Sequence, residues 1–260
     1  MTEYLISQGS ALYKGVSAFE PYINELHQRY ESEDFIDWPA IVLATTLQAT
    51  CISLFKLLPA REFGNEPLDK RSIASIVRNV VDTHDVIEML VNEQDSERFN
   101  LHRDIMGLYL SSRVNKVQSA ILPEKAQEIY KHTKQWYWER IKNSELYEKS
   151  MDRLKSGEAL FYQSRRQRLS NSCGKHADFV SGVLADLSTY VHSIPPSIWM
   201  SDTSNMYSDN ESNRNTVAVW LRISNFYFAQ SIKAVVDFAG LEISETMAEF
   251  MAHHEYVFSE

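Results

Sequence analysis

Apolar residues recur every three to four positions along most of this chain, the spacing that places them on one face of an α-helix. The clearest stripe lies in Arg71–Val91, where it comprises Ile73, Val77, Val80, Ile87 and Val91. Similar stripes predict further helices over residues 3–31, 39–58, 96–119, 123 to about 157, 175–192, 217–239 and 244–257.

Residues that start or stop helices support these limits. Leu68 or Asp69 is expected to open the helix that contains Arg71, and Gly240 to end the helix 217–239. Gly157 either ends or interrupts the helix from 123. Residues 165–174 are interpreted as a basic helix end followed by a loop, which places Cys173 in that loop. Residues 201–216 are predicted to form a long polar loop, because they show no apolar periodicity.

No segment shows the alternation of apolar and polar residues that is typical of a half-buried strand, and no repeat of fixed period is found. The fold class predicted is therefore all-α, a single multi-helix bundle of about eight helices. Because no clear linker divides the chain, residues 1–260 are predicted to form one domain.

Composition is ordinary for a globular chain, with 44% hydrophobic and 23% charged residues. The formal net charge of −9 argues against a broad electrostatic contact with nucleic acid. Cys51 and Cys173 are too few for a disulfide scaffold or a zinc site, and the first residues lack the pattern of a signal peptide. The apolar run 41–58 contains Gln48 and Lys56, and is interpreted as a core helix instead of a membrane span. A cytoplasmic protein without a membrane partner is expected.

The strongest chemical candidate is Arg78-Asn79-x4-His84. His84 stands where the stripe of its helix predicts an aliphatic side chain, and Arg78 lies six residues earlier, about 9 Å away along the helix axis. In a shared groove, the imidazole could act as a general base or acid at a ribose hydroxyl while Arg78 holds the phosphate. The alternative is structural, with a core histidine and an ion pair between Arg78 and Asp82.

Three further features carry candidate chemistry. His192 is expected to close its helix, one turn after Ser188, where the two could line a cleft. Arg71, Arg78 and His192 could alternatively form a pocket for a small anion. The basic run 165–168 is interpreted chiefly as a solvated helix end, and the aromatic triplets 136–138 and 226–228 as core or dimer packing.

Several enzyme classes lack their motifs. The chain has no Glu-x-x-His pair, His-Glu-x-x-His, Gly-x-x-x-x-Gly-Lys or Gly-x-Ser-x-Gly sequence. No cofactor and no metal site are therefore predicted.

Two resemblances bear on function. Arg71-Ser-Ile together with Leu-Ser-Thr-Tyr-Val-His192 resembles an uncharacterised family of bacterial helical domains, although Ser75 stands where that family often has an acidic residue. Arg78-Asn-x4-His84 resembles the HEPN superfamily, helical domains of toxins, CRISPR-associated proteins and antiviral systems. This second resemblance implies a dimer with a metal-independent endoribonuclease site, in which Arg78 binds phosphate, Asn79 supports it and His84 is the catalytic base or acid.

The resulting hypothesis is a HEPN-like RNA-binding protein or endoribonuclease in stress or phage defence. Arg78, Asn79 and His84 would be catalytic, and Arg71, Ser188 and His192 would bind the substrate. RNA, a second copy in a homodimer and another protein are the expected partners. The alternative hypothesis is a non-catalytic helical module for protein–protein interaction.

Overall fold

The computed structural model describes residues 2–31, 38–59, 68–191 and 208–256. Within these ranges every regular element is helical and none is a strand, which confirms the predicted all-α class. The chain divides into two compact units: residues 1–91 with 169–260, and residues 92–168. The second unit is thus an insertion between two halves of the first, and each unit is described separately.

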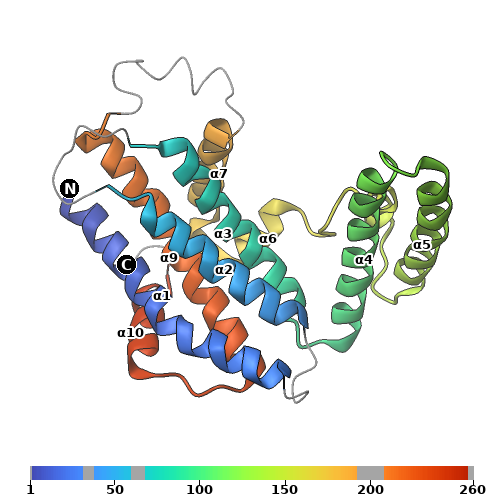
Figure 1. Cartoon of the computed structure of the whole chain (residues 1–260), viewed down its shortest axis with the longest axis horizontal. Coiled ribbons are helices and arrows are strands. Elements are labelled where there is room, and N and C mark those ends of the chain that lie inside the picture. Colours follow the sequence, from blue (N-terminus) through green and yellow to red (C-terminus); the bar gives the residue numbers. More distant parts are fainter. Residues whose placement is uncertain (1, 32–37, 60–67, 192–207, 257–260) are drawn as a thin grey trace. The chain divides into compact units, whose positions relative to one another are not determined.

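The first unit gathers helices from both ends of the chain (Figure 1). Its helices are α1 (Thr2–Glu31), α2 (Trp38–Lys56), α3 (Lys70–Leu90), most of α6 (Arg165–Cys173), the short 3₁₀ turn η2 (Gly174–His176), α7 (Ala177–Val191), α9 (Glu211–Ala239) and α10 (Glu245–His253).

Helix α9 is the centre of this unit. Twenty of its 29 residues are buried, and it packs against α1, α2, α3 and α10. The triplet Phe226, Tyr227 and Phe228 is almost fully buried, which confirms its prediction as core packing. A helix that is apolar on several sides is stable only when neighbours cover all of them, so α9 organises the helices around it.

The start of α9 differs from the prediction. Asn210 is its N-cap, accepting a hydrogen bond from the backbone N–H of Asn213 at 2.9 Å, so the expected loop over 201–216 is wrong for residues 211–216. Residues 201–207 of that loop lie outside the described residues. The helix tolerates polar residues here because they find buried partners. Lys70 Nζ donates to Asn213 Oδ1 at 2.6 Å, and the Arg214 guanidinium pairs with both carboxylate oxygens of Asp209.

Other helix ends agree better with the sequence. Asp69 caps α3 by accepting from the Ser72 N–H at 3.1 Å, and Gly240 ends α9 with a left-handed φ of 60°. The helix predicted over 175–192 begins later, because residues 175 and 176 belong to η2 and α7 starts at Ala177; its predicted end at His192 lies outside the described residues. Phe179 and Val191 of α7 are 45% and 37% exposed. The prediction of Cys173 in a loop is also wrong, because it is buried in α6.

The second unit is a helical hairpin with a short return. It contains α4 (Ser96–Gln118), α5 (Pro123–Asn143) and the 3₁₀ helix η1 (Lys149–Ser156). The carboxylate of Asp104 on α4 pairs with Arg140 on α5 at 2.8 Å. The unit has a hydrophobic core of its own, formed by Leu101, Ile105, Leu108, Trp138, Ile141, Met151 and Leu154.

This second core corrects the predicted end of one helix. The helix from Pro123 ends at Asn143 and not near Gly157, because the chain turns back to bury Met151 and Leu154; Gly157, at φ 73°, then ends η1. The single domain over residues 1–260 stays a prediction; the described residues form two separate buried clusters, one in each unit.

Helix α2 is the one described helix whose length and composition would suffice to cross a membrane, over Pro39–Lys56. It buries Ile41, Ala44, Leu47, Cys51 and Leu54 at helical spacing in the core of the first unit, and it packs against α1 and α3. This one-sided burial agrees with the core helix that the sequence predicts.

The close approach of α10 to α1 predicts a sharp difference between two glycines. A Cβ at Gly15 on α1 would lie 2.6 Å from Phe250 Cζ on α10, whereas a Cβ at Gly182 on α7 would meet nothing within 4 Å. Gly15→Ala should lower the free energy of unfolding by about 1–3 kcal/mol. Gly182→Ala should raise it by about 0.5–1 kcal/mol, because alanine favours a helix over the unfolded chain. Urea denaturation followed by circular dichroism measures both, and equal effects of the two substitutions would contradict this packing.

Candidate functional site

The structure brings Arg78 and Ser188 together. Arg78 lies on α3 with about a quarter of its side chain exposed, and its Nη1 donates to Ser188 Oγ on α7 at 2.6 Å. Its Nε lies 3.1 Å from the carboxylate of Asp82, one turn later, which confirms the i, i+4 ion pair. Ser188 in turn donates to the carbonyl oxygen of Leu184. The guanidinium is therefore engaged in fixing α3 to α7.

His84 lies on the buried side of the same helix. Its side chain is among the core residues, 2% exposed, 4.8 Å from the Tyr227 ring of α9 measured between centroids. Its Nδ1 is 3.0 Å from Ser231 Oγ, and that hydroxyl donates to the Tyr227 carbonyl oxygen at 2.8 Å. Ser231 therefore accepts the proton of Nδ1, and Nε2 is left as an acceptor with no hydrogen-bond partner among the described residues.

Burial also determines the charge of this imidazole. Desolvation lowers the pKa of His84 to about 3, so the ring is neutral at physiological pH. A general base must reach the proton that it removes. His84 is sealed from solvent, so its position does not support a catalytic role.

The remaining predicted residues do not complete a site. Asn79 is exposed on α3, and Arg71 is half-buried with its Nε shielded from solvent and without a hydrogen-bond partner among the described residues. His192 lies outside the described residues, since α7 is described to Val191. Of the five predicted residues that the structure describes, it thus brings Arg78 and Ser188 into contact.

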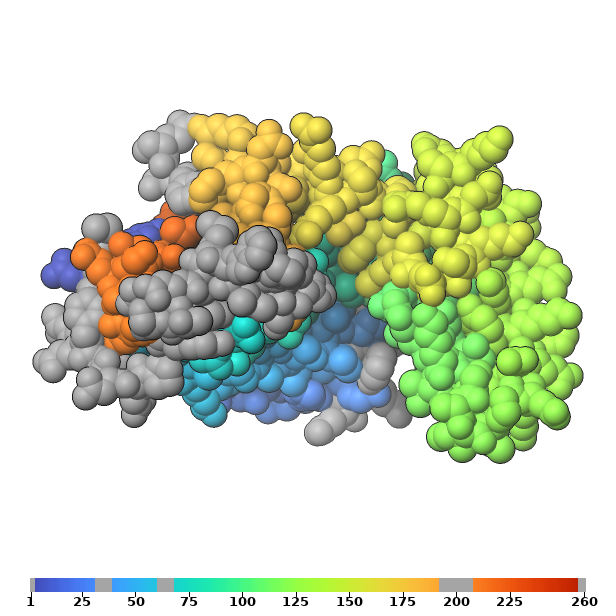
Figure 2. Space-filling model, turned by 90° about the horizontal axis from the view of Figure 1, so that it is seen from above, coloured from blue at the N-terminus to red at the C-terminus, as the bar shows by residue number. Residues whose placement is uncertain are grey.

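A feature that the sequence analysis missed lies on the hairpin of α4 and α5. Of the seventeen large hydrophobic side chains that are exposed among the described residues, seven fall within residues 110–136. They are Leu110, Val114, Val117, Ile121, Leu122, Ile129 and Trp136, each at least 50% exposed. We call this set the hairpin face; much of the surface of the hairpin is in view in Figure 2, in green to yellow-green.

A groove accompanies this face. It has a volume of about 400 Å³ and lies between α4 and α5, with Leu110 and Val114 on one wall and Ala126 and Ile129 on the other. The sequence does contain a pattern that could have indicated this face. The positions 110, 114, 117 and 121 form a second helical stripe, displaced from the buried Leu101, Ile105 and Leu108 of the same helix.

Charge divides between the two units. Residues 92–168 carry 15 Lys and Arg against 11 Asp and Glu, a formal net charge of +4, whereas the rest of the chain carries 11 against 24, a net charge of −13. The net charge of the whole chain is negative, although residues 92–168 are net positive. The hairpin face belongs to this basic unit.

Metal chemistry finds no support in the described part of the chain, where no group of three His, Cys, Asp or Glu side chains is placed to hold an ion. Comparison of the chain with known protein families, curated proteins and solved structures gave no match. The two family resemblances of the sequence stay predictions.

The sealed position of His84 predicts a pH dependence of stability. Its pKa of about 3 in the folded protein lies below the ordinary value of 6.5, so between these pH values the unfolded chain binds a proton that the folded chain does not. Stability is therefore lost as pH falls below about 6.5, by about 2 kcal/mol at pH 5 from this residue alone. His84→Phe should remove that part of the loss between pH 7 and pH 5 in urea titrations.

The matched control is His132→Gln, which changes an exposed histidine on α5 and should leave the pH dependence as it is. If His84→Phe also left the slope unchanged, the imidazole would be open to water and the core assignment would fail.

Proposed function

We propose that this chain is a non-catalytic helical interaction protein whose hairpin face binds an acidic amphipathic helix of a partner protein. The observation that carries the proposal is the clustering of seven exposed apolar side chains on one helical hairpin, beside a groove between its helices. Exposed apolar clusters of this kind mark binding surfaces, because they lose contact with water only when a partner covers them.

The groove geometry favours a helix as the bound element. Leu110, Val114 and Val117 recur at spacings of four and three on α4, and Ile129 and Trp136 lie seven residues apart on α5. Of these five side chains, Leu110, Val114 and Ile129 line the groove between α4 and α5, which can accept side chains from the apolar face of another helix.

The positive charge of the hairpin unit favours a partner helix whose polar face is acidic. The hairpin belongs to the unit with net charge +4, and Arg113, Lys125 and Lys131 are exposed on its two helices. Acidic residues beside the apolar stripe of the partner would raise the association rate and disfavour basic competitors. A symmetric pair of hairpins would bring two basic surfaces together, so we propose an acidic protein partner in place of the homodimer expected from the sequence.

This function is preferred over RNA cleavage on two grounds. A neutral imidazole buried beside Tyr227 has no route to a ribose hydroxyl. Exposed Trp136 is also a poor platform for stacked bases, since its ring packs edge-on against Tyr137 and lies 4.7 Å from the Arg140 guanidinium.

A peptide titration tests the proposal. The probe is a labelled synthetic helix of about 20 residues with Leu at i, i+3, i+4 and i+7 and Glu on the opposite face. Fluorescence anisotropy should show binding of this peptide, and Val114→Asp should weaken it by at least about tenfold, because the carboxylate would be buried in the apolar groove. The same peptide with Lys in place of Glu should bind more weakly.

Val42→Asp is the matched control, a change of the same kind at a valine of α2 that is 38% exposed, and it should leave binding intact. A shuffled peptide of equal composition controls for charge alone. Equal binding of the ordered and shuffled peptides would overturn the proposal, as would fragments of bulk tRNA that form when the purified protein is incubated with it in EDTA.

A further inference from the structure

The turn that closes the hairpin of α4 and α5 carries the most exposed large apolar side chain among the described residues. Ile121 is 74% exposed, and its neighbours Val117 and Leu122 are 66% and 60% exposed. None of the three lines the groove between the two helices, and we call them the hairpin tip. Figure 1 shows this turn joining the ends of α4 and α5, in green. Turns consist mostly of Gly, Pro, Asn, Asp and Ser, so an apolar tip indicates a surface that covers it.

The backbone of the tip is held by its own hydrogen bonds. The N–H groups of residues 119–122 donate to the carbonyl oxygens of Asn115, Val117 and Gln118 at 2.8–3.2 Å. In the apolar layer of a bilayer, each N–H group without a partner costs several kcal/mol. The tip can therefore approach such a layer without leaving these donors unpaired.

Helix α5 begins at the tip without a capping side chain. Leu122 is its N-cap and Pro123 lies at its start, so no side-chain oxygen of the cap accepts from the first N–H groups. Leucine is disfavoured at an N-cap, because these donors are then left to water or to a bound anion. Lipid phosphates lie directly beside the apolar layer that the tip would enter, and a helix start attracts them.

Cations flank the tip on both helices. The stretch from Arg113 to Lys131 contains four Lys and Arg against two Glu, a net charge of +2. Lys116 pairs with Glu158 at 2.9 Å. Arg113, Lys125 and Lys131 are exposed and belong to no ion pair within 4.0 Å among the described residues. An anionic bilayer attracts such cations, whereas acidic residues that stay farther than about 10 Å from it oppose the attraction only weakly.

We propose that the hairpin tip inserts into the surface of anionic phospholipid bilayers. Its three apolar side chains reach the boundary between the head groups and the acyl chains, and the cations beside them contact the lipid phosphates. With so few groups involved, the contact is weak and reversible, and it spans no membrane. It adds a lipid surface to the partners of the chain, for which no membrane was expected from the sequence.

A bilayer fits the tip better than a second protein surface does. A stable protein interface buries about 1,200–2,000 Å² in total, which is more than three side chains on a turn provide. A partner helix needs a concave surface, and the groove beside the tip supplies one without using any residue of the tip.

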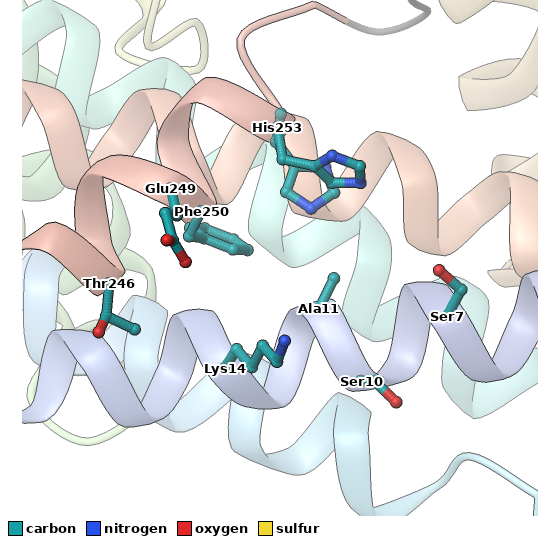
Figure 3. Close-up of a pocket in the computed structure, with 9 residues that line it drawn as sticks. Ser7, Ser10, Ala11, Lys14, Thr246, Glu249, Phe250 and His253 are labelled. Atoms are coloured by element: carbon teal, nitrogen blue, oxygen red, sulfur yellow. The ribbon is translucent and has the colours of Figure 1, made fainter.

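The cavity of about 370 Å³ between α1 and α10 does not indicate a ligand in the same way. Figure 3 shows Lys14 of α1 and Glu249 of α10 on its opposite sides, and both residues are exposed. The two ring nitrogens of His254 are buried, so a ligand in the cavity does not reach them. Exposed charges on two facing helices are ordinary surface chemistry, and we assign no site there.

Vesicle sedimentation with the full-length chain tests the proposed contact. We expect the protein to pellet with phosphatidylcholine vesicles that contain about one third phosphatidylserine, and much less with phosphatidylcholine alone. Ile121→Ser combined with Leu122→Ser should lower the partition coefficient by at least about tenfold, because apolar side chains drive insertion. Lys125→Gln combined with Lys131→Gln should lower it by a similar factor on the anionic vesicles.

The matched control is Val42→Ser combined with Ile243→Ser, which changes two exposed apolar side chains of the first unit and should leave vesicle binding intact. Insertion itself is followed with an environment-sensitive fluorophore attached at Leu122→Cys. Its emission should shift to the blue on anionic vesicles, whereas the same label at Ile243→Cys should not respond. The native Cys51 and Cys173 are buried and stay unlabelled.

Three results would overturn the proposal: no binding to anionic vesicles, equal binding to both kinds of vesicle, or a partition coefficient that the double serine variant of the tip leaves unchanged. A lipid-free dimer that this variant converts to a monomer would also overturn it, because a second copy would then cover the tip. The same variant keeps the lining of the groove, so it should still bind the acidic peptide. The membrane contact and the proposed protein partner can therefore fail independently.

Discussion

The burial of α9 on nearly every side is the constraint on which the first unit depends. The backbone N–H and C=O groups inside an α-helix bond to each other, but polar side chains on a buried helix need hydrogen-bond partners of their own once water is removed. Several polar residues of α9 do so individually, whereas Ser224 Oγ and Asn225 Oδ1 have no hydrogen-bond partner among the described residues. Asn225 donates to Gln8 of α1, Arg214 pairs with Asp209, and the Tyr227 hydroxyl contacts the Cys173 thiol of α6 at 3.2 Å. Each of these contacts fixes the position of a neighbouring element.

The same constraint explains the role of His84. The ring occupies a core position because α3 faces α9 there, and Ser231 of α9 provides the acceptor for its Nδ1 proton. Burying the second ring nitrogen of a neutral histidine without a hydrogen-bond partner lowers the free energy of unfolding by about 1–3 kcal/mol. The burial of a large apolar core can offset this loss. The titratable group that stood out in the sequence is therefore accounted for by packing, and the conspicuous Arg78 by its bonds to Asp82 and Ser188.

The fold class and most helix positions could be predicted because they follow from local rules. Apolar periodicity located α3 and α9, and the caps at Asp69 and Gly240 have their usual chemistry. The polar start of α9 was missed because its residues look like a loop until Lys70 and Asp209 are seen to satisfy them.

The sites were harder to predict, for a physical reason. Which face of a helix is covered depends on tertiary contacts, so the apolar pattern of α4 alone did not indicate that Leu110 and Val114 are exposed. The cavity of about 370 Å³ between α1 and α10 brings together the two ends of the sequence, which no short spacing links. The periodicity of apolar residues does not encode such a juxtaposition.

The discontinuous first unit has a consequence for biosynthesis. About 120 residues separate the end of α3 at Leu90 from the start of α9 at Glu211. At translation rates of about 5–20 residues per second, α1, α2 and α3 leave the ribosome about 6–24 s before the helix that covers them. The inserted hairpin unit, complete by residue 168, can fold during that interval. Nascent chains would therefore expose the apolar stripes of the first three helices, and chaperones that shield such stripes would determine how much of the protein reaches its native state.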